Sequence, residues 1–287
     1  RTQGELLTNG LSAALGAGYR HVDTAALYGN EATVGKVIKA SGVARRDVTI
    51  ATKLWCSEHG REKTKRAIAS SLKELGLDYV DLYLIHAPRN QGKSPGEIIS
   101  LRHESWAVME EFQRKGVLKS IGVVSGGRLR ITPHPCFAPF AATSPISSQS
   151  NFNKAQLQLL MKSGTVRPSV NQIEFHPYLQ QPQLLEFCRS SGIAVEAYGV
   201  MGAKGVLEDP VMKRVAKKHR KTTAQVSIKF ALQEGLVVLA KSNTPARVSE
   251  NADVFDWSLD GADLEALRGL DRADGLGRSY WDNTRVP

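Results

Sequence analysis

The sequence contains no hydrophobic run near the roughly 18 residues that a membrane-spanning helix needs, which argues against an integral membrane protein. Its N-terminus lacks both a signal-peptide core and an initiator methionine, so we expect the chain to begin inside a longer reading frame. Cysteine is scarce: Cys56, Cys136 and Cys188 lie far apart and show no CxxC or Cys/His ligand spacing. We therefore expect no metal site and a reducing, cytoplasmic location.

A glycine-rich GxGxxG turn is absent after every predicted strand, which argues against a Rossmann-type dinucleotide domain. The net charge of +10 is compatible with nucleic-acid binding, but the densest basic run, KRVAKKHRK at 213–221, has no interleaved aromatic residues for base stacking. We interpret this run as a solvated helix face and expect no nucleic-acid partner. A salt-dependent gel shift would support the minor alternative of a nucleic-acid-binding protein.

Strand-like and helix-like segments alternate along nearly the whole chain. Segments rich in apolar and β-branched residues predict seven strands buried on both faces, at 19–25, 48–54, 79–87, 120–124, 169–175, 194–200 and 237–242. Amphipathic patterns predict helices at 4–17, 31–41, 62–75, 104–114, 154–162, 183–190, 211–219 and 224–233. This alternation favours an α/β fold with a parallel sheet: a (β/α)8 TIM-type barrel missing one strand, or an open doubly wound sheet.

Polar side chains stand at the C-terminal ends of three consecutive predicted strands. These are Asp23, Lys53 and His86, and Tyr28 lies in the loop after the first strand. In a parallel barrel such positions face one shared cleft. Three of these residues have a structural alternative: Asp23 as a loop aspartate, Tyr28 as a packing tyrosine and His86 as a core histidine. Lys53 is harder to explain in this way, because a lysine at the end of an apolar strand is rarely buried without a partner. Their joint occurrence favours a site.

These four groups suit the protonation of a carbonyl oxygen. A phenol has a reference pKa of about 10, too weakly acidic for this task near neutrality, and a nearby ammonium lowers that pKa. We predict that Lys53 acts in this way on Tyr28 and that Asp23 keeps the ammonium charged and in place. His86 is expected to orient the substrate carbonyl. In such a set, the tyrosine is a general acid that protonates the carbonyl oxygen while a hydride is transferred to the carbonyl carbon.

Six segments carry a resemblance to a known family: GYRHVDTAALYGNE, IATKLW, DYVDLYLIHAP, SNFN, VNQIEFHPYLQQ and LAKSNTPARVSENADVFDWSL. In order and over nearly the whole chain, they resemble the signature segments of the aldo-keto reductases. The resemblance implies a single barrel domain over residues 1–287 that uses NADPH without a Rossmann fold, with a small-molecule carbonyl as substrate. It implies Tyr28 as the acid, Lys53 and Asp23 as its pKa-lowering pair, and His86 as the carbonyl-orienting residue. We expect a monomer.

The resemblance also implies a site for NADPH/NADP+. Ser150, Asn151 and Gln172 match residues that hydrogen-bond the nicotinamide carboxamide, and Tyr198 matches the aromatic residue that stacks on the ring. The residues that match the 2′-phosphate clamp and the neighbours of the adenine are Lys241, Ser242, Arg247, Glu250 and Asn251. Independently, SNTPARVSEN predicts a helix start with Thr244 as its cap, where two cations and a helix N-terminus favour a phosphate; a plain solvated cap is the alternative.

The sequence departs from the family pattern at several places. The family's first strand, which precedes the helix at 4–17, is absent. The stretch AYGVMGAKG at 197–205 replaces the usual AYSPLGxG, and Ala87 stands where many relatives have Trp, which we expect to widen the substrate pocket. We expect Trp55 to line that pocket.

The largest departure is a patternless segment between SIGV and SNF. Deleting residues 124–149 restores SIGVSNFNKAQL, and the 26 deleted residues keep the reading frame. Val-Ser can be encoded by GTG-AGT and Gln by CAG, which match a splice donor and a splice-acceptor ending. We therefore predict that 124–149 is a non-family insertion, a translated intron or gene-model error. The transcript sequence tests this hypothesis, which fails if every mature message contains these codons.

The sequence thus predicts an oxidoreductase that reduces aldehydes or ketones to alcohols by hydride transfer from NADPH, with a tyrosine as the general acid. The alternative is a catalytically silent NADP-binding barrel that serves as a sensor or regulatory subunit. Oxidation of the cofactor by generic aldehydes separates the two. The loops at the barrel mouth determine the substrate, and the sequence does not identify it.

Overall fold

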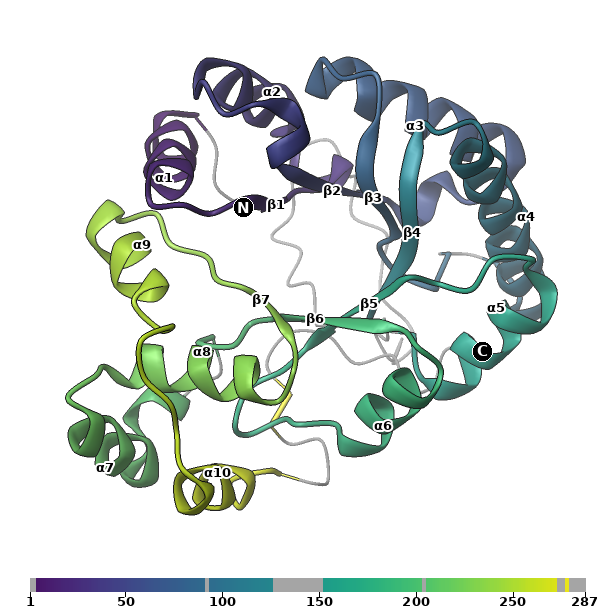
Figure 1. Cartoon of the computed structure of the whole chain (residues 1–287). Helices are drawn as coiled ribbons and strands as arrows, with labels where there is room; N and C mark the ends of the chain where they lie inside the picture. The colour runs from purple at the N-terminus through teal and green to yellow at the C-terminus, as the bar shows by residue number, and fades with distance from the viewer. Residues whose placement is uncertain (1–3, 91–92, 126–151, 203–204, 273–276, 279–287) are drawn as a thin grey trace, which may run out of the picture.

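The computed structural model describes residues 4–90, 93–125, 152–202, 205–272 and 277–278. Seven strands form one parallel sheet in the order β1 to β7, and helices surround it (Figure 1). The strands are β1 (His21–Asp23), β2 (Thr49–Leu54), β3 (Val80–Ile85), β4 (Leu118–Ser125), β5 (Val170–Glu174), β6 (Ala194–Tyr198) and β7 (Val237–Leu239). All seven predicted strands are confirmed, each with shorter bounds or shifted ends.

Most of the helices connect successive strands, as a parallel sheet requires, whereas the first one precedes β1 and the last two follow β7. They are α1 (Gly4–Gly16), α2 (Glu31–Ala40), α3 (Arg61–Leu75), α4 (Pro95–Arg114), α5 (Lys154–Ser163), α6 (Pro182–Ser190), α7 (Pro210–His219), α8 (Thr223–Gln233), α9 (Pro245–Ala252) and α10 (Gly261–Arg268). Helix α4 begins nine residues before its predicted start, because Ser94 and Glu97 form a capping box. Helix α10 was not predicted, although Asp260 and Asp263 form the same kind of box.

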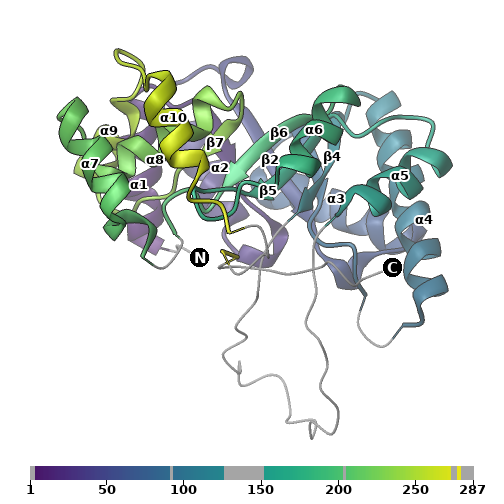
Figure 2. The same ribbon diagram turned by 90° about the horizontal axis from the view of Figure 1, so that it is seen from below.

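The strand order confirms a nearly closed barrel of the (β/α)8 type, with seven strands in the described part of the chain. Each strand pairs in parallel with the next along the chain, from β1 with β2 to β6 with β7. Among the described residues, β1 and β7 are the two ends of this order. Figure 2 shows α1 and α7 to α10 on one side of the strands and α3, α4 and α5 on the other.

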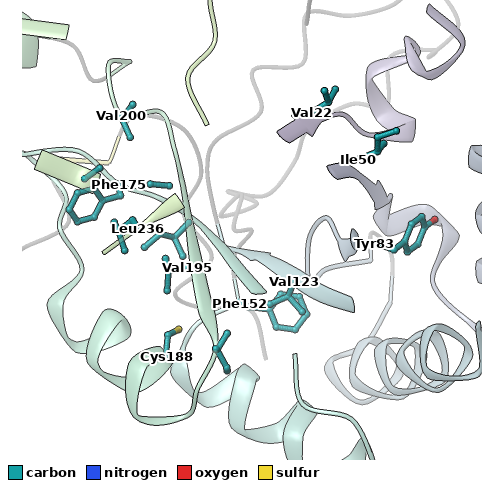
Figure 3. Close-up of a cluster of buried hydrophobic side chains, with 14 of the residues drawn as sticks. Val22, Ile50, Tyr83, Val123, Phe152, Phe175, Cys188, Val195, Val200 and Leu236 are labelled. Carbon is teal, nitrogen blue, oxygen red and sulfur yellow. The ribbon is translucent and has the colours of Figure 1, made fainter. Parts of the chain in front are cut away.

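The alternation of side chains along each strand separates an outer apolar core from an inner one. The larger core lies between strands and helices and includes Val22, Ile50 and Tyr83, which come from three neighbouring strands (Figure 3). The smaller core fills the barrel interior with Ala51, Leu82, Leu84 and Val124. Polar residues of the same strand faces, such as Lys53 two positions after Ala51, therefore point into the barrel.

Strand β4 includes the first two residues of the predicted insertion. Val124 and Ser125 pair in register with Gln172 and Ile173 of β5. Residues 126–149 of the predicted insertion lie outside the described residues, so its boundaries remain a prediction. Within the described ranges, no helix is long and apolar enough to cross a membrane.

Candidate active site

A buried lysine and an aspartate form the centre of the site. Lys53 on β2 has no exposed surface, and its Nζ lies 2.6 and 2.5 Å from the two carboxylate oxygens of Asp23 at the end of β1. Nζ also donates to the carbonyl oxygen of Thr24 at 2.9 Å. A buried ammonium with three acceptors is held in one position, as the sequence predicts for this pair.

The surroundings of Lys53 keep its side chain charged. Burial alone would lower the pKa of the ammonium, because it removes water from the charged form. The Asp23 carboxylate, and after it Tyr28, outweigh this effect, so the pKa of Lys53 is raised above its usual value. The site therefore contains a permanent cation at neutral pH.

Tyr28 is positioned against this cation by a short local structure. It ends the 3-10 turn η1 (Ala26–Tyr28), which closes at Gly29 with the left-handed φ of 62°. The Thr24 hydroxyl donates to the Asn30 side chain at 2.7 Å across the same loop. The Lys53 ammonium lies 5.4 Å from the centroid of the Tyr28 ring. The loop after β1 thus returns the phenol to the buried pair.

His86 follows β3 and completes the predicted set of four. Its ring contacts Tyr28 edge-on at a centroid distance of 5.6 Å and Trp55 edge-on at 5.2 Å. Ala87, the next residue, is fully buried. The structure therefore brings together the predicted catalytic residues Asp23, Tyr28, Lys53 and His86, and Trp55 contacts the histidine.

A glutamate that the sequence analysis did not single out extends this group. The Gln172 amide nitrogen on β5 donates to Asp23 Oδ1 and to Glu196 Oε2, both at 2.9 Å. Glu196 on β6 is buried and lies 3.3 Å from His21 Nε2 of β1. Its signal in the sequence is one acidic residue inside the apolar segment AVEAYGV. In this structure, Gln172 directs its N–H groups to two carboxylates rather than into an open cleft.

The residues predicted to bind the cofactor phosphate surround the start of α9. Lys241 and Arg247 are exposed, Ser242 is half-buried, and Lys241 and Arg247 form no ion pair within the described residues. Thr244 occupies the N-cap position as predicted, but its side chain makes no capping hydrogen bond. The Ser242 hydroxyl instead bonds the backbone N–H and C=O of Thr244, at 3.1 and 3.3 Å.

The other predicted cofactor residues differ in their surroundings. Tyr198 is half-buried and packs against the inner core. Asn251 is buried, and Glu250 accepts a hydrogen bond from the Thr222 hydroxyl at 2.7 Å, which directs its carboxylate toward the start of α8. Ser150 and Asn151 lie outside the described residues. These cofactor assignments therefore remain predictions.

A buried histidine lies in the loop that carries Trp55. His59 is 1% exposed, and neither of its ring nitrogens has a hydrogen-bond partner within the described ranges. Burial, with a smaller contribution from the Arg102 guanidinium, lowers the pKa of His59 to about 3. No cluster of three His, Cys, Asp or Glu side chains in the described part of the chain is suited to a metal ion.

Comparisons of the sequence with known proteins all indicate the same family. The sequence matches the Aldo/keto reductase family over residues 3–128 and 147–272. It is 38% identical to aldo-keto reductase family 1 member C1 of Macaca fuscata fuscata, over 90% of this chain and 81% of that protein. It is 36% identical to glyoxal reductase of Bacillus subtilis, over 96% of this chain and 87% of that protein.

Solved structures show the same fold. An aldo/keto reductase from Brucella melitensis superposes with a TM-score of 0.79 at 42% identity, covering 94% of this chain and 91% of that one. A mutant of Gox0644 in complex with NADPH superposes with a TM-score of 0.82 at 34% identity, covering 100% and 92%. Sequence, fold and the grouping of the four polar residues agree, and the chain belongs to the aldo/keto reductase family.

Proposed function

We propose that this protein reduces aldehydes or ketones to alcohols with NADPH, using Tyr28 as the general acid. The observation that carries the proposal is the fully buried Lys53 ammonium, held by Asp23 and facing the Tyr28 ring at 5.4 Å. Such a cation favours the ionised form of a phenol held against it, which makes the phenol a better proton donor to a nascent alkoxide. His86, in edge contact with Tyr28, supports a carbonyl oxygen placed between the two side chains.

The chain's own residues account for the proton side of the reaction. The substrate carbonyl accepts a hydrogen bond from Tyr28, and His86 fixes its orientation. As negative charge develops on the oxygen, Tyr28 transfers its proton, and Lys53 stabilises the phenolate that remains. Asp23 prevents the ammonium from turning away. NADPH, when bound, supplies the hydride to the carbonyl carbon.

The residues around α9 fit the 2′-phosphate of NADPH. Two exposed cations flank a helix start whose Thr244 side chain caps none of the first N–H groups. Backbone N–H groups at a helix N-terminus and adjacent cations favour a phosphate. Lys241, Ser242 and Arg247 would hold this group, and Tyr198, packed against the inner core, would stack on the nicotinamide.

The substrate is a small-molecule carbonyl that enters beside His86. Trp55 contacts the His86 ring and would line the path of the substrate, and Ala87, the residue after His86, is fully buried and carries only a methyl group. We further propose a monomer in the cytoplasm, which size-exclusion chromatography and cell fractionation would test. The free cysteines Cys56 and Cys188 are consistent with a reducing compartment.

The decisive experiment measures NADPH oxidation with a panel of aldehydes and ketones. Replacing Tyr28 by Phe removes the acid and keeps the ring, so we expect kcat to fall by about 10²–10⁴-fold. Tyr79→Phe is the matched control, because Tyr79 contacts Arg45 just before β3, at the end of that strand opposite to His86. A wild-type protein that binds NADPH and turns over no carbonyl would support the alternative of a silent barrel.

A further inference from the structure

A row of polar groups crosses the barrel interior from the catalytic pair to a partly exposed histidine. Asp23 Oδ1 and Glu196 Oε2 accept hydrogen bonds from the same Gln172 nitrogen, both at 2.9 Å. Glu196 Oε1 lies 3.3 Å from His21 Nε2, whose side chain is 26% exposed. These contacts join strands β1, β5 and β6, and Gln172 and Glu196 are register neighbours in the sheet.

The charged groups that face Glu196 come from two strands. His21 and Asp23 lie on β1, and Lys53 lies on β2, while the neighbouring strand β5 presents the neutral Gln172. Burial raises the pKa of Glu196, and Asp23 raises it further, whereas His21, Gln172 and Lys53 act in the opposite direction. The negative charge of Glu196 in turn contributes to the raised pKa of Lys53.

We propose that Glu196 is a positioning residue that acts through Gln172 and Asp23 and sets the pH range in which Tyr28 and Lys53 keep their protons. This inference rests on the proposed function, in which Tyr28 must carry a proton to reduce a carbonyl. The Gln172 amide bridges two carboxylates that would otherwise repel each other. Asp23 is thereby held by Gln172 as well as by Lys53.

The charge of Glu196 has a defined effect on its neighbours. An anion inside the barrel favours the ammonium over the neutral amine at Lys53 and the phenol over the phenolate at Tyr28. Removing the anion is therefore expected to lower the pKa of both groups, so that each loses its proton at a lower pH. Because charges in a protein interior interact more strongly than in water, the shift is measurable across several ångströms.

The experiment replaces Glu196 by Gln, which keeps the shape and removes the charge. The alkaline limb of the kcat/KM profile for carbonyl reduction is expected to move to lower pH by about half to one unit. Glu186→Gln on the exposed face of α6 removes the same charge outside the barrel and is expected to leave the limb in place. A uniform loss of activity with an unshifted limb would mean that Glu196 only packs, and would overturn the proposal.

A second measurement does not depend on turnover or on NADPH. The near-ultraviolet absorbance of tyrosinate, taken as the difference between each protein and its Tyr28→Phe counterpart, gives the titration of Tyr28 alone. In Glu196→Gln, and in the apolar variant Glu196→Met, the midpoint is expected at lower pH than in the wild type. An unchanged midpoint contradicts the proposal, and so does failure of both variants to fold, since that would assign Glu196 to the core.

The outcomes separate this inference from the proposed function. If Tyr28→Phe retains full activity, the general-acid assignment fails, whatever Glu196→Gln does. If Tyr28→Phe is inactive and Glu196→Gln matches Glu186→Gln at every pH, the function stands and the role of Glu196 fails.

Discussion

Two lysines lie at the C-terminal ends of strands of the same barrel and have opposite surroundings. Lys53 on β2 has no exposed surface and bonds Asp23 and the Thr24 carbonyl. Lys241, just after β7, is exposed and makes no ion pair within the described residues. The first cation is already committed to groups of the protein, whereas the second is available to a ligand. In our proposal, Lys53 belongs to a catalytic half of the rim, with Asp23, Tyr28 and His86, whose groups already contact one another, and Lys241 belongs to a cofactor half at the start of α9, which an anion would complete.

The strongest test of the catalytic half is Lys53→Met. The variant removes the cation beside Tyr28 and leaves Asp23 without its partner, so we expect kcat to fall by about 10³-fold or more. NADPH affinity, measured by quenching of protein fluorescence, is expected to change by less than about threefold, because Lys53 is too deeply buried to contact the cofactor phosphates.

The control for this variant also removes the charge of Asp23, which has lost its ammonium partner. The double variant Lys53→Met/Asp23→Asn also removes the carboxylate that Lys53→Met leaves without its ammonium partner, and it should fold like the wild type. If it recovers most of the wild-type kcat, the cation is not required and the proposed acid fails.

The cofactor half is expected to show the opposite kinetic pattern. Lys241→Met removes a charge that, in our proposal, meets the 2′-phosphate, so NADPH affinity should fall by about 10–100-fold, the cost of a charge-assisted hydrogen bond. The kcat at saturating NADPH and the affinity for NADH should stay unchanged, because NADH carries no 2′-phosphate. Equal losses for NADH and NADPH would show that Lys241 serves the general fold of the loop.

The two halves also differ in how far the sequence predicted them. Asp23, Lys53 and His86 end apolar strands, so the strand pattern alone places them at one rim. Gln172 and Asp23 are 149 positions apart, and their hydrogen bond depends on which face of β5 points inward. Glu196 was missed for the same reason, since one acidic residue in a short strand gives no sign of its face. The register with Gln172 supplies that information.

Helix starts that depend on loop residues are the other features that the sequence pattern did not predict. The N-cap of α9 was located at Thr244, but its side chain does not cap the helix; the hydrogen-bonding side chain at this turn is Ser242, which bonds the N–H and C=O of Thr244. The early start of α4 depends on the Ser94–Glu97 pair, which lies before the amphipathic pattern begins. Local hydrogen bonding of this kind is not visible in hydrophobic periodicity.

Removal of residues 124–149 tests whether the residues that follow β4 contribute to NADPH binding. With this segment, Ser125 ends the strand and Gly126 follows it; without it, Ser150 and Asn151 follow Val123 directly. Because an Asn side chain and a Ser hydroxyl then reach the strand end together, we expect NADPH affinity to rise by about 5–30-fold, the contribution of one or two hydrogen bonds. Equal affinity of the two chains in an equilibrium titration would contradict this prediction.

The smallest effect on kcat is expected for a substitution of His59. Instead, this buried histidine is expected to make the stability of the fold depend on pH in the acid range. The folded-state pKa of about 3 lies below the ordinary value of 6.5, so the unfolded chain binds the proton first as the pH falls. The corresponding stability is complete above about pH 6.5 and decreases toward pH 3, which amounts to about 2 kcal/mol between pH 7 and pH 5. His59→Phe should lose this dependence in urea unfolding and keep the wild-type kcat at pH 7. Lys241→Met is the control, and its free energy of unfolding should depend on pH as that of the wild type does over the same range. If His59→Phe remains as acid-sensitive as the wild type, the buried imidazole is not the cause.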